Sequence, residues 1–215
     1  KDADSITGCY LDVPEEREHG ITVDGDNRNV TVATTVIKGT DDKGFNKGIV
    51  LNGKNNNLTV DGTHIDTWGY AIDTEKAENS SLTIKNGSYV KGYAALSLYQ
   101  ANGTNAAIED STLIGQNPGG GQENIYGVIA AEASTNVKIK IDNTMVYAQS
   151  AENAAPQIEN IIIFNGGNDG VDIRVDDTPK PGQALSAFNI NNTATNAMIG
   201  YGTNGGPDNT NCAVT

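Results

Sequence analysis

Two stretches of the sequence decide the fold: NNNLTVDGTHI at residues 55–65 and SSLTIKNGSYV at residues 80–90. Each begins with polar residues, continues with Leu-Thr-Val or Leu-Thr-Ile, and then passes through a turn of small polar residues. Apolar and polar residues alternate in both, as at Leu58 and Val60, which is typical of a half-buried β-strand. Leu58 and Leu82 lie 24 residues apart, so the two stretches predict a repeated strand unit.

The same block recurs along most of the chain. We take the equivalent residues of this first block to be Val30, Leu58, Leu82, Ala106, Ile139 and Val171, at steps of 28, 24, 24, 33 and 32 residues. A second apolar block follows, with Ile49, Ala71, Ala95, Val128 and Ile162 taken as equivalent. A propeller blade needs four strands in ~40–45 residues. Two or three strands in ~24 residues therefore favour a parallel β-helix, a solenoid that belongs to the all-β class.

A β-helix stacks each residue on its equivalent in the next coil. We expect one inward ladder of Leu58, Leu82 and Ala106, and a second of Val60, Ile84, Ile108 and Ile141. Turn positions are expected at Gly62, Asn86, Asp110 and Asn143, because Gly, Asn and Asp best tolerate left-handed backbone geometry. The column before the turn is expected to face solvent and comprises Asp61, Lys85, Glu109 and Asp142.

The sequence predicts one domain over residues 1–200, with about six to seven coils. Residues 1–20 are expected to form an N-terminal cap, because LDVPEEREHG (11–20) places Pro and charge where the first coil starts. Residues 201–215 read as a polar C-terminal tail or linker. Whether Cys9 and Cys212 form an intramolecular disulfide stays open: export favours the pair, and the length of the solenoid opposes it.

Composition excludes several classes of function. The net charge is −13 and the pI is near 4.4, so the chain would be repelled by nucleic acid and by anionic membrane surfaces. The sequence has no apolar window of 18 residues, so no membrane-spanning helix is expected. It has no C-x-x-C spacing either, so no zinc or redox site is expected. The acidic stretch NDGVDIRVDD (168–177) lacks the ligand order of an EF-hand and reads as a solvated turn rather than a calcium site. We expect no metal and no cofactor.

Two insertions mark a candidate binding flank. Extra residues at 115–126 and 148–159 fall at the same corner of adjacent coils, and insertions on one face of a solenoid often form its binding face. They could equally be tolerated surface loops. The aromatic residues near this corner could stack on sugars or simply seal the coil. The candidate ligand-binding residues are Tyr93, Asn117, Gln122, Glu123, Asn124, Tyr126, Gln149, Glu152 and Asn153.

No catalytic cluster is evident. Asp73 lies in the second block, but we take its equivalents to be Ser97, Ala130 and Phe164, so the column holds no second acid for glycoside hydrolysis. The chain is therefore expected not to be an enzyme.

The phrases NNNLTVDGTHI, SSLTIKNGSYV and GYAALSL resemble the repeats of pertactin-type and AIDA-type autotransporter passengers over roughly residues 20–190. The resemblance implies a right-handed, single-stranded β-helix and adhesion or aggregation at the bacterial surface. The chain departs from that family in its two cysteines and in the absence of a recognisable C-terminal barrel. A β-helical head of another surface system, such as a fimbrial tip adhesin, would accommodate disulfides formed in the periplasm.

Three functions follow as expectations. The first is a bacterial adhesin domain, at the cell surface or secreted, that binds host glycans or proteins through the flank with the insertions. The second is a polysaccharide lyase or glycoside hydrolase acting on acidic polysaccharide, because such enzymes are also β-helical. The third is a structural spacer or a self-associating stalk.

Overall fold

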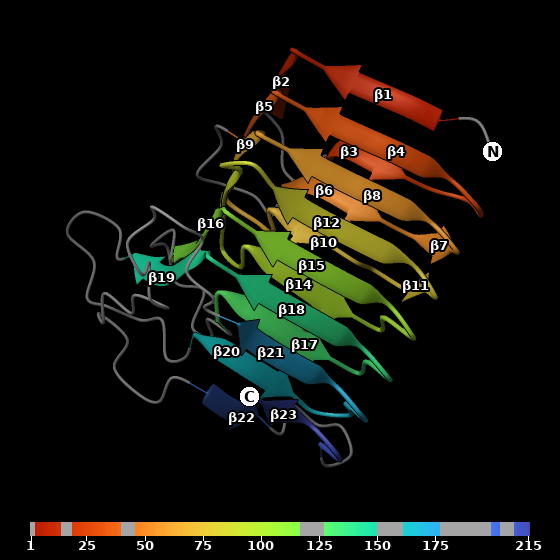
Figure 1. Cartoon of the computed structure of the whole chain (residues 1–215), viewed down its shortest axis with the longest axis vertical. Coiled ribbons are helices and arrows are strands. Elements are labelled where there is room, and N and C mark those ends of the chain that lie inside the picture. Colours follow the sequence, from red (N-terminus) through yellow and green to blue (C-terminus); the bar gives the residue numbers. More distant parts are fainter. Residues whose placement is uncertain are drawn as a thin grey trace.

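The computed structural model describes residues 3–13, 19–39, 46–116, 127–149, 161–176, 199–202 and 209–215. Within these ranges the chain is all-β, contains no helix, and builds parallel sheets (Figure 1). Figure 1 shows the strands stacked from β1 near the N-terminus to β23 near the C-terminus.

Three large sheets contain almost all the strands. The eight-stranded sheet has the order β1 (Ala3–Thr7), β4 (Asn29–Ala33), β8 (Asn57–Asp61), β12 (Ser81–Lys85), β15 (Asn105–Glu109), β18 (Lys138–Asp142), β21 (Asp172–Asp176), β23 (Ala213–Val214). The six-stranded sheet has the order β19 (Met145–Gln149), β16 (Thr112–Gln116), β13 (Tyr89–Gly92), β9 (His64–Asp66), β5 (Val36–Gly39), β2 (Tyr10–Val13). The seven-stranded sheet has the order β22 (Ile199–Gly202), β20 (Ile162–Asn165), β17 (Ile129–Glu132), β14 (Leu96–Tyr99), β10 (Ile72–Asp73), β6 (Lys47–Leu51), β3 (His19–Val23). A small sheet pairs β11 (Ala77–Glu78) with β7 (Gly53–Lys54).

The chain visits the eight-, six- and seven-stranded sheets in turn, and one such passage is called a repeat below. Every strand pairing is parallel and joins equivalent strands of neighbouring repeats, as between β8 and β12. The predicted register of the first block is confirmed: Leu82 pairs with Leu58 and with Ala106. The second ladder is confirmed as well, because Ile84 pairs with Val60 and Ile108. Both ladders are buried in the hydrophobic core between the sheets.

Two register assignments were wrong. In β21 the partner of Ile139 is Ile173 and not Val171. Alternation could not separate these two, because a slip of two residues keeps side chains on the same face. In the seven-stranded sheet the partners of Ile49 and Ile162 are Ile72 and Ile129, one residue later than the expected Ala71 and Val128. Ala95 is likewise displaced by Leu96, which pairs with Ile72 and Ile129.

The second error has a physical cause in the burial of these strands. All four residues of β20 are buried, as are the last four residues of β6. In these strands the outward-facing side chains are therefore buried as well as the inward-facing ones. Such strands do not show the alternation from which a register can be read.

The predicted turns adopt left-handed geometry. Gly62, Asn86, Asp110 and Asn143 have φ values of 54°, 56°, 47° and 43°. Amide and carboxylate side chains at these turns also form hydrogen bonds between neighbouring repeats. Asn143 Nδ2 donates to Asp110 Oδ1 at 2.6 Å, and Asn86 Nδ2 donates to Asp61 Oδ1 at 2.8 Å. The turns are therefore stabilised both by residue choice and by contacts between repeats.

A column of buried hydroxyl groups follows each turn. Thr63 N–H donates to Ser88 Oγ at 3.2 Å, and Ser111 N–H donates to Thr144 Oγ1 at 3.4 Å, so each backbone N–H binds the side chain of the next repeat. These hydroxyls donate in turn to backbone carbonyls, as from Thr63 Oγ1 to Val32 O at 3.0 Å. The column satisfies polar groups that the turn would otherwise bury unpaired.

Both ends of the chain differ from expectation. Part of the expected N-terminal cap forms β1, β2 and the start of β3, so the sheets begin at Ala3. Part of the expected tail, residues 209–215, joins the stack, because β23 pairs with β21.

Cys9 and Cys212 are both free. Cys9 follows β1 and Cys212 precedes β23, and these strands are the opposite edges of the eight-stranded sheet. At ~4.8 Å per strand the edges lie roughly 34 Å apart, far beyond the Cα separation of a disulfide.

Candidate functional site

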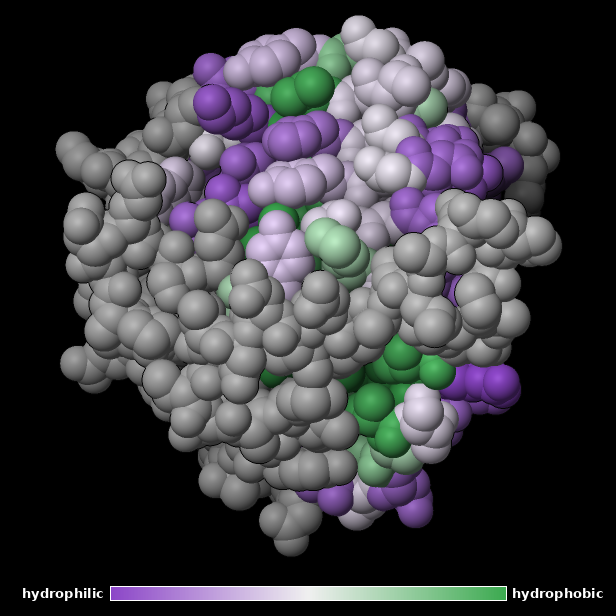
Figure 2. Space-filling view, turned by 60° about the vertical axis from the view of Figure 1, so that its left-hand side comes forward, coloured by the Kyte–Doolittle hydropathy of each residue, from purple (hydrophilic) through white to green (hydrophobic). Residues whose placement is uncertain are grey.

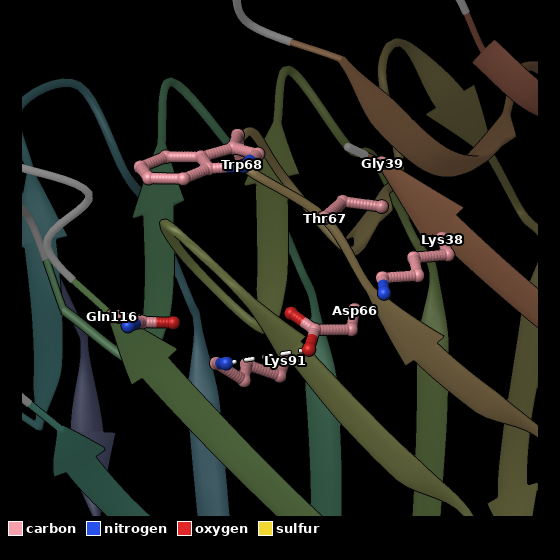
Figure 3. Close-up of a pocket in the computed structure, with 7 residues that line it drawn as sticks. All are labelled: Lys38, Gly39, Asp66, Thr67, Trp68, Lys91 and Gln116. Atoms are coloured by element: carbon pink, nitrogen blue, oxygen red, sulfur yellow. Dashed lines mark hydrogen bonds and ion pairs between the residues drawn. The ribbon is translucent and has the colours of Figure 1, made fainter. Parts of the chain in front are cut away.

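A pocket on the outer face of the six-stranded sheet is the first candidate site, and we name it the Trp68 pocket (Figure 3). It has a volume of about 300 Å³. Its lining residues are Lys38, Gly39, Asp66, Thr67, Trp68, Lys91 and Gln116. They come from β5, β9, β13 and β16 and from the two residues that follow β9, so the pocket runs across four repeats.

The floor of the Trp68 pocket is a row of alternating charges. Lys38 and Lys91 are the register partners of Asp66 on either side, so the three side chains follow one another at the ~4.8 Å strand spacing. Lys91 Nζ lies 3.3 Å from Asp66 Oδ2. On its other side Lys38 has Asp12 as its register partner, so the row Asp12, Lys38, Asp66, Lys91 alternates in sign and its formal charges cancel. Within the described ranges Lys38 makes no ion pair, and of these four residues Lys38, Asp66 and Lys91 line the pocket.

Trp68 forms one wall of the pocket, where the chain leaves β9. Its backbone N–H donates to Asn46 Oδ1 at 3.0 Å, and the buried Asn46 donates from Nδ2 to Val13 O at 3.1 Å. Figure 3 shows the indole ring on one side of the pocket, with Gln116 and the Lys91–Asp66 pair on the other. The half-buried ring is thus held in place and still presents surface to the pocket.

The residue before Trp68 adds a polar group. Thr67 is buried, and its Oγ1 has no hydrogen-bond partner among the described residues. A buried hydroxyl without a partner is unusual in folded proteins. Because Thr67 lines the pocket, a bound molecule could supply that partner.

An aromatic row runs beside the pocket on the same sheet face. His64 and Tyr89 are register partners, and their rings stack with centroids 4.5 Å apart and planes 8° apart. Val36 precedes them and pairs with Tyr10, which is 63% exposed. Figure 2 shows this face, where hydrophobic and hydrophilic residues follow one another in bands. The pocket therefore lies between this row and Trp68.

A second pocket lies on the seven-stranded sheet, and we name it the Asp73 pocket. It has a volume of about 240 Å³. Its lining residues are Lys47, Tyr70, Asp73, Glu75, Ser97, Leu98, Tyr99, Ala130, Glu132 and Asn165. Lys47 Nζ binds two of its carboxylates, at 2.6 Å from Asp73 Oδ2 and 3.0 Å from Glu75 Oε2. Glu132 Oε2 accepts a hydrogen bond from Asn165 Nδ2 at 2.9 Å.

Burial and neighbouring charges have opposite effects on the pKa values of Asp73, Glu75 and Lys47. Burial raises the pKa of Asp73 above its ordinary value, and this outweighs the opposing effects of Lys47 and the Ser97 hydroxyl. The pKa of Glu75 is lowered, chiefly by its hydrogen bond to Lys47. Burial alone would lower the pKa of Lys47, but its two carboxylate partners together raise it. Lys47 is therefore an ammonium ion at neutral pH and does not act as a base.

Most of the residues that the sequence suggested as ligand-binding lie outside the described ranges or do not line either pocket. Tyr93 is only 3% exposed and belongs to the hydrophobic core, with its ring centroid 6.2 Å from that of Tyr70, which favours the sealing role over stacking on sugars. Seven expected residues lie outside the described ranges: Asn117, Gln122, Glu123, Asn124, Tyr126, Glu152 and Asn153. Gln149 ends β19, and its side chain is not described. Gln116, at the root of the 115–126 insertion, lines the Trp68 pocket.

Asp73 was dismissed for lack of a second acid in its column. The register confirms Ser97 and Ala130 as its successors but replaces Phe164 by Ile163. The other acids come from the neighbouring column, to which Glu132 belongs as the register partner of Tyr99. Comparing positions two residues along each strand would have revealed this grouping, because alternate residues share a face.

Within the described ranges, no cluster of three or more His, Cys, Asp or Glu side chains could hold a metal ion. In the same ranges, no helix has the length and apolarity needed to cross a membrane. No model of a known protein family matches the chain, and no curated protein matches its sequence.

Proposed function

We propose that the chain is a right-handed, single-stranded parallel β-helix that serves as an adhesin domain at a bacterial cell surface. The in-register pairing of successive repeats and the regular passage through three sheets support the β-helix. The surface location and the adhesive role rest on the resemblance to autotransporter passengers described above.

The ligand of this adhesin is a host glycan that contains an acidic sugar, and it binds in the Trp68 pocket. One observation carries the proposal: the Trp68 ring faces a row of Lys38, Asp66 and Lys91 spaced one residue per repeat. An aromatic ring stacks on the apolar face of a sugar, while charged and amide groups bind its hydroxyls. Lys38, which makes no ion pair within the described ranges, supplies an ammonium group for a sugar carboxylate.

The position of the pocket supports the same conclusion. Gln116, the second residue of the 115–126 insertion, is the last residue of β16 and lines the pocket, so the described part of this insertion reaches the site.

A glycan array tests the proposal. Wild-type protein is expected to bind glycans with uronic or sialic acids, and Trp68→Ala and Lys38→Met are each expected to weaken binding at least about tenfold, as for the loss of one stacking or charge-assisted contact. Tyr10→Ala is the matched control, because Tyr10 is an exposed aromatic residue on the same sheet but outside the pocket. Binding that survives both pocket variants would assign the glycan to another surface.

A carbohydrate-active enzyme is the second candidate, because the Asp73 pocket contains three carboxylates. A buried Asp73 with a raised pKa fits a general acid of glycoside hydrolysis. Two features oppose it: Lys47 already binds one oxygen of both Asp73 and Glu75, and the net negative charge repels an acidic polysaccharide. If the wild type cleaves oligo-uronates or neutral oligosaccharides and Asp73→Asn does not, the protein is an enzyme and the adhesin proposal is wrong.

A further inference from the structure

The Asp73 pocket contains a buried carboxylate oxygen to which the described residues make no hydrogen bond of normal geometry. Asp73 is 1% exposed; its Oδ2 accepts from Lys47 Nζ at 2.6 Å, whereas its Oδ1 makes no hydrogen bond of normal geometry. Besides Lys47, the hydroxyl of Ser97, the register partner of Asp73, acts on this carboxylate and lowers its pKa. Buried carboxylate oxygens nearly always have a donor, since an unpaired one loses its hydration without compensation. A ligand that brings a donor to Oδ1 would therefore gain a contact that the protein leaves unmade.

The charge of the pocket defines what kind of donor it accepts. The lining contains three carboxylates, Asp73, Glu75 and Glu132, and one ammonium group, Lys47, so its net charge is −2 when all are ionised. Lys47 binds Asp73 and Glu75, whereas Glu132 lies two strands beyond Asp73 and binds Asn165. An anionic ligand would be repelled. A neutral hydroxyl compound would supply donors without reducing the charge, whereas a protonated amine supplies three donors and a positive charge.

The pocket already holds one ammonium group in the expected surroundings. Lys47 Nζ lies 5.9 Å from the centroid of the Tyr70 ring, which is within the range of a cation–π contact. Tyr99 lines the same pocket, one strand further along, beside Glu132 as its register partner. Acidic and aromatic side chains in one cavity are the combination by which proteins bind organic ammonium ions.

The size of the pocket limits the ligand. Its volume of about 240 Å³ is below the ~300 Å³ at which pockets for drug-sized ligands begin, so it suits one small group and not a chain. A metal ion is a poor alternative, because no three metal-binding side chains within the described ranges come together.

We propose that the Asp73 pocket binds a protonated primary amine, carried by an amino sugar or by a lysine-like alkyl chain, with Asp73 Oδ1 as its acceptor and Glu132 at the rim as a further negative charge. This inference is independent of the proposed function of the Trp68 pocket. The two pockets lie on different sheets and share no lining residue.

Isothermal titration calorimetry of the whole chain at low ionic strength tests the inference. The probes are D-glucosamine and cadaverine, with D-glucose and N-acetyl-D-glucosamine as uncharged counterparts. Wild type is expected to bind at least one of the two amines and neither uncharged sugar. Binding of D-glucosamine alone identifies the amino sugar, and binding of cadaverine shows that the alkyl amine suffices. No heat from either amine at about 10 mM, or equal affinity for D-glucose, would overturn the inference.

Three variants locate the site. Asp73→Asn keeps the shape of the side chain and removes its charge, and it is expected to weaken amine binding at least about tenfold. Glu132→Gln at the half-buried rim is expected to weaken it by roughly three- to tenfold, and it serves if Asp73→Asn fails to fold, which circular dichroism reports. Glu109→Gln on the eight-stranded sheet, outside both pockets, is the matched control and should leave amine affinity unchanged. Full affinity in a folded Asp73→Asn or Glu132→Gln protein would refute the site.

Discussion

Leu82→Ala is the sharpest test of the in-register stack. Leu82 is 1% exposed and pairs with Leu58 on one side and Ala106 on the other. Removing three buried carbons costs about 2.4 kcal/mol at ~0.8 kcal/mol per carbon. The ladders hold the backbone on both sides, and Ala106 offers only a methyl group to fill the space. A residual cavity of roughly 50 Å³ then adds about 1 kcal/mol at ~24 cal/mol per Å³, so we expect a loss of about 3.5 kcal/mol in the free energy of unfolding.

Urea denaturation followed by circular dichroism and by the fluorescence of Trp68 measures this loss, and the two signals should coincide if unfolding is two-state. Thr83→Ala is the matched control. Thr83 lies in the same strand with its side chain on the opposite face, and its replacement should change stability by no more than about 0.5 kcal/mol.

Double variants test the register itself. Leu58→Ala and Leu82→Ala should be non-additive by about 0.5–3 kcal/mol because the side chains are in contact. Leu58→Ala and Ile139→Ala should add within about 0.5 kcal/mol, because three strand spacings separate them by roughly 14 Å. A loss below about 1 kcal/mol for Leu82→Ala, or equal coupling in the two pairs, would refute the stacking argument.

Three further predictions concern the turns, the charges and the thiols. In urea denaturation, the free energy of unfolding of Asn86→Ala should be about 1 kcal/mol lower than that of Asn86→Gly, because φ at this position is 56° and a Cβ atom disfavours positive φ. Both variants lose the side-chain amide, so its loss cancels in the comparison, and equal stability would contradict the prediction. Since Lys47 lowers the pKa of Glu75 from its ordinary 4.5, the stability from this pair is present above about pH 4.5 and lost as the pH falls through the lowered pKa. Between pH 5 and 3 the melting temperature of the wild type should therefore fall more steeply than that of Glu75→Gln. The extra loss of stability in the wild type should be less than about 1 kcal/mol, and parallel curves would refute the contribution of the ion pair. Ellman's reagent should titrate two thiols without reductant, Cys9 before Cys212, because burial raises the pKa of Cys212; fewer than two would indicate a disulfide.

The first block and its turns could be predicted from the sequence because each leaves a local trace. Leu58 and Val60 alternate with polar residues, which only a half-buried strand requires. The turn residues, such as Gly62 and Asn86, are of the types that tolerate positive φ. Stacking then repeats these choices in the next repeat, so self-similarity of the sequence carries information about pairing.

The pockets depended on the tertiary structure. Strands β6 and β20 of the seven-stranded sheet are buried at nearly every position, so their register left no alternation to read, and only the three-dimensional pairing brings Lys47 against Asp73. The Trp68 pocket joins side chains from four repeats, and their order along one outer face depends on that same register. The sequence by itself determined the inward ladders of the first block as far as β18, because burial in a shared core restricts those positions to apolar residues. Outward-facing residues carry no such restriction, so only the tertiary structure decided which polar side chains meet on the outer faces.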